Sequence, residues 1–229
     1  MHQISPAPST QATTRDAIFF SFRQAALTEY FNEFARLEGD LDAIASEACR
    51  VVAEGMEARF TGMLQYRVDH DIFVLQAGTG WPARMIGCTR VAADLGTTAG
   101  LAWLTGQLVQ FQQLDATGCI RVPKAMVGHG VRRMVSVPIR GDGHKAFGLL
   151  EVGSTDADEF TRRDLTFLQS IADSVAAVMS LQSSRLGRTE QAELLAGRQA
   201  ALSGRLNVAV GRQDPVGIIY QQDTQSGTG

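Results

Sequence analysis

The residues that could perform chemistry are three cysteines and four histidines, and both sets are scattered along the chain. A catalytic site needs a nucleophile with a base and an orienting partner, or a cluster of metal ligands. No histidine has a second ligand at close spacing, and no Cys-x-x-Cys pair is present. The sequence therefore supports no metal site, and we expect no catalytic residue.

Two side-chain types nevertheless allow a second interpretation. His129 lies between Gly128 and Gly130, and it can serve as a pocket residue, an axial haem ligand or the cap of a short helix. The Gly-His-Gly setting favours the cap. Cys88 and Cys119 have arginines nearby in the sequence, which would lower a thiol pKa. Buried, inert cysteines are commoner, so we interpret both as structural.

Charge and hydropathy exclude two classes of partner. The formal net charge is -3, with Lys+Arg 21 and Asp+Glu 24, which gives no electrostatic reason to expect nucleic acid. No stretch is apolar for the roughly 18 residues that a membrane-spanning helix needs, and the polar N-terminus is unlike a signal peptide. We predict a cytoplasmic protein that binds neither nucleic acid nor membrane.

Helical periodicity flanks a strand-rich middle. We predict a first helix over 15–37, a second from Asp40 to Gly55, and a last one that follows the capping-box residues Thr161 and Asp164. Strands are predicted over 61–67, 71–77, 84–91, 107–111, 132–139 and 146–153, and short helices over 98–105 and 122–128. The last two strands form a hairpin, and helices at both ends of an antiparallel sheet indicate an α+β fold.

Several local strings, in this order, resemble the GAF domain family over about residues 38–182, and are most similar to GAF domains that precede bacterial sensor histidine kinases. They include Leu75-Gln76-Ala77-Gly78-Thr79-Gly80-Trp81, Gly100-Leu101-Ala102-Trp103, His129-Gly130-Val131 and Phe147-Gly148-Leu149-Leu150-Glu151-Val152. The resemblance implies an antiparallel sheet of about six strands, with N- and C-terminal helices on one face and a loop-built ligand pocket on the other. It also implies terminal helices that pair in a dimer.

Composition, periodicity and the resemblance together divide the chain into five segments. They are a disordered N-terminus over 1–14, a helix over 15–37, the GAF domain over 38–182, a helical extension over 183–210 and a disordered tail over 211–229. The stretch after Ser180 contains no histidine and no Gly-rich nucleotide motif, so we expect either a stand-alone regulator or a sensory module that acts through a partner such as a histidine kinase.

The type of ligand stays open. The signature of cyclic-nucleotide GAF domains is not found, and Cys119 is followed by Ile120 where bilin attachment would favour histidine. Cys88 does not match the context seen in GAF-type free methionine sulfoxide reductases. We therefore leave the cofactor unknown.

Pocket residues follow from the resemblance, because Trp81 and Trp103 fall where a GAF pocket is built and aromatic walls suit a small-molecule site. The predicted ligand-binding residues are Trp81, Met85, Leu101, Trp103, Phe111, His129, Met134, Ser136 and Leu149. The alternative is a core in which these side chains fill the space themselves.

The apolar stripe of the last helix continues toward Leu186 and, together with Phe19, Phe22 and Tyr30 of the first helix, exceeds what one domain can bury. This seam predicts a homodimer. The function we expect is a non-catalytic sensory domain that binds a small molecule and signals through its terminal helices. The alternatives are a ligand-free scaffold and, behind it, an enzyme of the methionine sulfoxide reductase kind.

Overall fold

The computed structural model describes residues 10–111, 128–141, 146–155 and 160–184. The chain divides into two compact units, Met1–Gln182 and Ser183–Gly229, and the sheet with its covering helices belongs to the first. Most of the predicted extension over 183–210, the tail over 211–229 and most of the predicted helix over 122–128 lie outside the described residues.

Two helices precede the sheet, as predicted. Helix α1 spans Thr10–Leu37 and α2 spans Leu41–Gly55, so α1 begins before residue 15 and includes residues that we assigned to a disordered segment. The Asp40 carboxylate accepts a hydrogen bond from the Asp42 backbone N–H and caps α2, as its residue type predicts.

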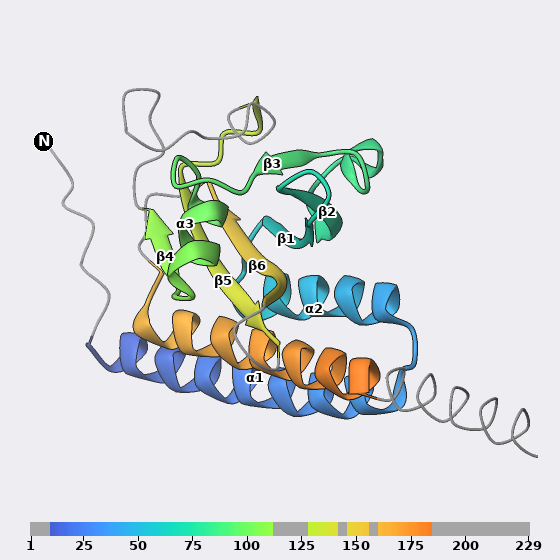
Figure 1. The fold of residues 1–229 in the computed structure, drawn as a ribbon. Helices are drawn as coiled ribbons and strands as arrows, with labels where there is room; N and C mark the ends of the chain where they lie inside the picture. Colours follow the sequence, from blue (N-terminus) through green and yellow to red (C-terminus); the bar gives the residue numbers. More distant parts are fainter. Residues whose placement is uncertain (1–9, 112–127, 142–145, 156–159, 185–229) are drawn as a thin grey trace, which may run out of the picture. The chain divides into compact units, whose positions relative to one another are not determined.

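The sheet has six antiparallel strands in the order β3-β2-β1-β6-β5-β4 (Figure 1), which confirms the predicted α+β fold. Its strands are β1 (Phe60–Arg67), β2 (Ile72–Thr79), β3 (Arg90–Ala92), β4 (Val109–Phe111), β5 (Arg133–Arg140) and β6 (Ala146–Ser154). The register of β2 on β1 shifts at Gln76, because Met63 pairs with Ala77 and Leu64 pairs with Leu75. Because of this bulge, Leu75 and Ala77, which flank Gln76, point to opposite faces of the sheet.

The predicted strand over 84–91 is wrong for most of its length. Residues Ala83–Met85 form the 3-10 turn η1 after Pro82, and only the end of the segment pairs with β2 as β3. The Met85 backbone N–H donates to the Pro82 carbonyl, and Gly87 takes up a positive φ of 74°. These local bonds bend the segment away from the extended form that its alternating residues suggested.

One face of the sheet is covered by α1, α2 and a last helix that is described over residues 162–184 (Figure 1). Its start is the predicted capping box: the Thr161 N–H donates to the Asp164 carboxylate, and the Asp164 N–H donates to the Thr161 hydroxyl. The buried core between helices and sheet includes Phe31, Ile44, Val51, Val137, Leu150, Leu168 and Ile171.

Helix α1 carries two apolar stripes. Phe31 and Ala35 are buried against the other helices, and Leu27 packs beside them. The stripe that the sequence predicted to exceed the domain's core points outward: Phe19 is 65% and Phe22 is 73% exposed. The helix therefore has more apolar surface than this unit covers.

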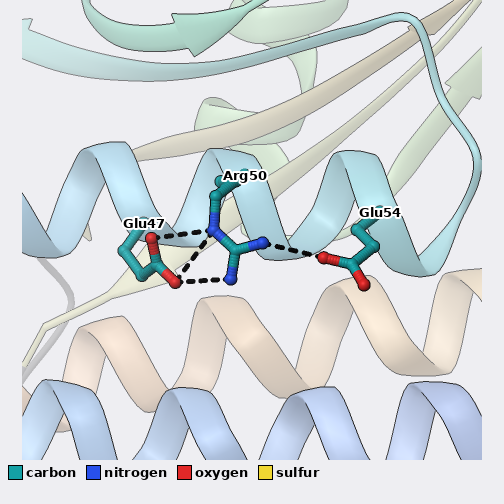
Figure 2. A network of polar contacts seen from close by, with 3 residues as sticks. All are labelled: Glu47, Arg50 and Glu54. Atoms are coloured by element: carbon teal, nitrogen blue, oxygen red, sulfur yellow. Dashed lines mark hydrogen bonds and ion pairs between the residues drawn. The ribbon is translucent and has the colours of Figure 1, made fainter.

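A polar network lies on the outer side of α2 (Figure 2). Arg50 donates to both Glu47 and Glu54, at 2.6 Å and 2.7 Å at the closest, and its guanidinium lies 5.7 Å from the centre of the Tyr30 ring of α1. The hydrogen bond from Arg50 holds the pKa of Glu47 below its ordinary value. Exposed ion pairs contribute little to stability, so this network fixes side chains more than it holds the fold together.

Candidate functional site

A small cavity lies on the sheet face opposite the terminal helices. Its volume is about 20 Å³, which is room for roughly one water molecule. The lining is mostly apolar and comes from β1, β2, the following loop, β3, β5 and β6. It consists of Phe60, Thr61, Gly62, Leu64, Leu75, Trp81, Met85, Thr89, Val91, Met134, Glu151 and Gly153.

Glu151 is the acidic member of this lining. The alternation of side chains along β6 determines which face of the sheet it points to. Its neighbours Leu150 and Val152 enter the core under the helices, so Glu151 faces the cavity. Only 4% of the residue is exposed, and its Oε1 accepts a hydrogen bond of 2.5 Å from the hydroxyl of Ser136, its partner across β5 and β6. Burial raises the pKa of the Glu151 carboxyl to about 7, and the Ser136 hydrogen bond opposes that shift.

Trp81 covers the cavity from the loop after β2. Its indole N–H donates to the Thr61 carbonyl at 2.9 Å, which ties the loop to β1. The loop can approach because Gly78 has no side chain: a Cβ there would lie 2.6 Å from the Thr61 carbonyl oxygen and 2.8 Å from the Trp81 ring. Gly80, with φ of 78°, makes the turn that brings the indole over the sheet.

An aromatic cluster closes the cavity at its β1 end. The Phe60 ring is 4.7 Å from the Trp81 ring, centre to centre, and the His129 ring is 5.7 Å from both. His129 follows Gly128 at the end of a helical turn and precedes Gly130, whose φ is 73°. The imidazole thus packs on the outer side of the aromatic pair.

A second aromatic cluster lies next to the cavity, beneath α3 (Thr98–Thr105). Trp103 packs on Tyr66 at 4.4 Å and edge-on to Phe73 at 5.4 Å between ring centres. The helix has the predicted bounds. The Thr97 hydroxyl caps its start by accepting from the Gly100 N–H, and Gly106 ends it with φ of 65°.

The predicted pocket residues fall into three groups. Trp81, Met85 and Met134 line the cavity, and Ser136 and His129 contact lining residues. Trp103 and Leu149 belong to the neighbouring cluster under α3. The remaining two are half-buried: Leu101 lies on α3, and Phe111 pairs with Met134 across β4 and β5.

Sequence reasoning missed Glu151, although a signal was present. A charged residue inside the apolar run of residues 147–152 must be buried if that run is a central strand. Phe60 and Thr61 were missed as well. The residue types at the start of β1 do not distinguish a strand that lines a cavity from one that packs in the core.

The two cysteines that the structure describes do not line this cavity. Cys49 is fully buried in α2, and burial raises the pKa of its thiol to about 12, so it is inert as a nucleophile. Cys88 is exposed in the turn before β3, and Cys119 lies outside the described residues. In the described ranges, no group of three or more His, Cys, Asp or Glu side chains is placed to hold a metal ion.

Solved structures share this architecture. The GAF domain of a phosphoenolpyruvate-protein phosphotransferase from Coxiella burnetii superposes with a TM-score of 0.65 at 13% identity, covering 73% of this chain and 98% of that one. The free methionine-R-sulfoxide reductase of Neisseria meningitidis, solved with its substrate, gives 0.60 at 20% identity over 80% and 99%. A GAF sensor protein from Burkholderia vietnamiensis gives 0.60 at 20% identity over 72% and 98%.

At these identities the superpositions establish the fold alone, and no curated protein matches the chain in sequence. The sequence model of the GAF domain family, however, matches residues 38–180, which is more than half of the chain and contains the whole sheet and the cavity. The chain belongs to the GAF domain family.

Proposed function

We propose that this chain is a non-catalytic sensory domain of bacterial signal transduction that binds a small molecule in the cavity and signals through its terminal helices. The observation that carries the proposal is the buried Glu151 carboxyl, which faces a cavity walled by Trp81 and Met134 on the side of the sheet away from the helices. A buried ionisable group in a largely apolar concavity is typical of a ligand site.

A series of hydrogen bonds runs from the cavity cover to the helices. Trp81 bonds the Thr61 carbonyl, and the Thr61 hydroxyl donates to the Cys49 carbonyl of α2 at 2.9 Å. At the end of α2, the buried Gln24 side chain of α1 donates to the Gly55 carbonyl and to Asp164 of the last helix. Movement of Trp81 on ligand binding would therefore act on all three helices.

The first and last helices lie side by side and run parallel (Figure 1). Their hydrogen bonds join Ala17 to Arg163, Asn32 to Ser174, and Gly39 to Gln182. Two parallel helices that are joined along their length suit an output in which a helix pair shifts between two packings.

The outward stripe of α1 supports a homodimer. Ile18, Phe19 and Phe22 are all more than half exposed, and Leu181 of the last helix is 47% exposed. Ile18, Phe19 and Phe22 lie on adjacent turns of α1, and an exposed apolar patch of this kind marks a protein interface. A histidine kinase or another signalling protein is the partner that we propose for the dimer, in the cytoplasm. None of the helices that the structure describes is long and apolar enough to cross a membrane.

A ligand-free scaffold is the second candidate, and the cavity volume of about 20 Å³ favours it, because side chains already fill most of the space. A methionine sulfoxide reductase ranks behind both, since Cys49 is buried and Cys88 is exposed. A reductase activity of the unmodified protein that is lost when Cys88 and Cys119 are changed to serine would restore that candidate. An unmodified protein without reductase activity would remove it.

Native mass spectrometry of the freshly purified full chain tests the proposal. We expect a dimer whose mass exceeds that of two chains by a small molecule, which is released on denaturation. A dimer of unliganded chains that also stays unliganded after incubation with small-molecule mixtures would favour the scaffold, and a monomer would contradict the helix-mediated output.

A further inference from the structure

The ligand class can be inferred from the charge balance around Glu151, and this step rests on the proposed ligand-binding function. Among the described residues, the ion pairs join Arg23 to Glu57 and Arg50 to Glu47 and Glu54, and none involves Glu151. The Glu151 carboxyl instead accepts a hydrogen bond from the neutral Ser136 hydroxyl. A buried carboxylate without a cationic partner is costly.

The other lining residues that the structure describes supply no compensating positive charge. Beside Glu151 they offer aromatic rings, thioethers and aliphatic groups, with Thr61 and Thr89 as the hydroxyl-bearing residues. The Phe60 ring already has the Arg59 guanidinium 5.2 Å from its centre. The face of Trp81 carries the negative side of an aromatic quadrupole, and the thioethers of Met85 and Met134 are polarisable. Each of these groups attracts a cation and discriminates against an anion.

The size of the cavity narrows the class of ligand further. The cavity of about 20 Å³ matches one water molecule, and a primary ammonium group is of similar size and has three donors. One donor can reach the Glu151 carboxylate, while a bulkier quaternary head would require the wall to move. An organic tail on the amine would leave past the side chains of Trp81 and Met85, which are half-buried on the covering loop.

We propose that the cavity binds the ammonium group of a small primary amine, with Glu151 as its counter-ion and Trp81 as its aromatic wall. The carboxylate, which Ser136 orients, then gains the charge partner that none of the described residues provides. Selectivity for cations over neutral molecules of the same shape follows from the loss of that pair when the ligand is uncharged.

The probe is butylammonium, and 1-butanol is its neutral counterpart. The chain has two tryptophans, so a Trp103→Phe background makes Trp81 the sole indole reporter at the cavity. We expect butylammonium to change Trp81 emission saturably and to bind about tenfold or more tightly than 1-butanol. Ligand-observed NMR on the unmodified chain gives the same comparison without the background change.

Glu151→Gln tests the counter-ion, because the amide keeps an oxygen that can accept from Ser136 but removes the charge. Butylammonium should then bind about tenfold or more weakly, while 1-butanol affinity stays the same. Glu54→Gln removes a surface carboxylate that is 43% exposed and should change neither affinity. If Glu151→Gln does not fold, Ser136→Ala serves instead, since it keeps the charge and should keep the preference for the amine.

Equal affinity for the amine and the alcohol, insensitive to Glu151→Gln, would overturn the amine inference and leave a ligand-binding pocket in place. An absence of saturable binding by butylammonium would also overturn it. The native mass measurement of the full chain then decides separately whether the pocket binds any small molecule at all.

Discussion

Glu151 and Ser136 lie directly opposite each other on β6 and β5, and the Ser136 hydroxyl donates to the Glu151 carboxyl at 2.5 Å in a site where Glu151 is 4% exposed. The two residues are the polar centre of a sheet face whose other cavity-lining members are largely apolar. Both the stability and the proposed chemistry of the domain depend on the charge state of that carboxyl.

Stability should fall with pH relative to the Glu151→Gln variant. The pKa of Glu151 is raised from its ordinary value of 4.5 to about 7 by burial, so its contribution is fully present below 4.5 and is lost as pH rises through 7. Among the described residues, the others that line the cavity carry no carboxyl, amine or imidazole. Urea unfolding of both proteins should show a difference that changes by up to about 3 kcal/mol over this window. A difference that is constant from pH 4.5 to 8 would contradict burial of the carboxyl.

Truncation of Trp81 should destabilise the domain more than removal of its hydrogen bond alone. Trp81→Phe keeps a ring against Phe60 but loses the bond to the Thr61 carbonyl, and we expect a loss of about 1 kcal/mol. Trp81→Ala should cost about 3 kcal/mol by chemical denaturation. Val68→Ala, at a side chain that is 77% exposed, should be neutral. Equal stability of all three variants would mean that Trp81 does not cover the cavity.

Gln24 should be important for the packing of the three helices. Its side-chain amide, 4% exposed, donates at 3.0 Å to the Gly55 carbonyl and at 2.9 Å to Asp164. Gln24→Ala leaves both acceptors without this donor, so we expect a loss of about 2 kcal/mol in the free energy of unfolding. Gln169→Ala is the matched control, because Gln169 bonds Asp173 on its own helix. A cost no larger than the control's would argue against this role.

The outward stripe of α1 should control the oligomeric state. Phe22→Glu places a charge on a side chain that is 73% exposed, so the fold should persist while a dimer built on this stripe dissociates. Analytical ultracentrifugation should show a shift from dimer to monomer, with an unchanged circular dichroism spectrum. Leu95→Glu, at a side chain that is 62% exposed before α3, should leave the dimer intact. A dimer that survives Phe22→Glu would place the interface elsewhere.

Local signals predicted much of the fold. Asp40 and the Thr161–Asp164 pair each marked a helix start, because a cap depends on residue type at one position. The segment over 84–91 failed because its alternation mimicked a strand, while Pro82 and a positive φ at Gly87 made a turn.

The candidate site was harder to predict, since its members meet through long-range pairing. The aromatic signal found Trp81 and Trp103 alike, but strand register decides that Trp81 lines the cavity and Trp103 packs on Tyr66 and Phe73. Glu151 was not predicted as a site residue, because its neighbours in the sequence are apolar. Which apolar stripe of α1 is buried also depends on the partner helices, because both stripes have helical spacing.

The most direct test of a ligand-binding pocket is NMR of methionine methyl groups in the full chain, titrated with a set of small cations, anions and neutral compounds. Met85 and Met134 line the cavity, whereas Met179 lies on the last helix. We expect small ammonium compounds to shift Met85 and Met134 in a saturable manner, and Met179 to respond as the helices repack. If no compound of any class shifts Met85 or Met134, the domain does not sense through this cavity.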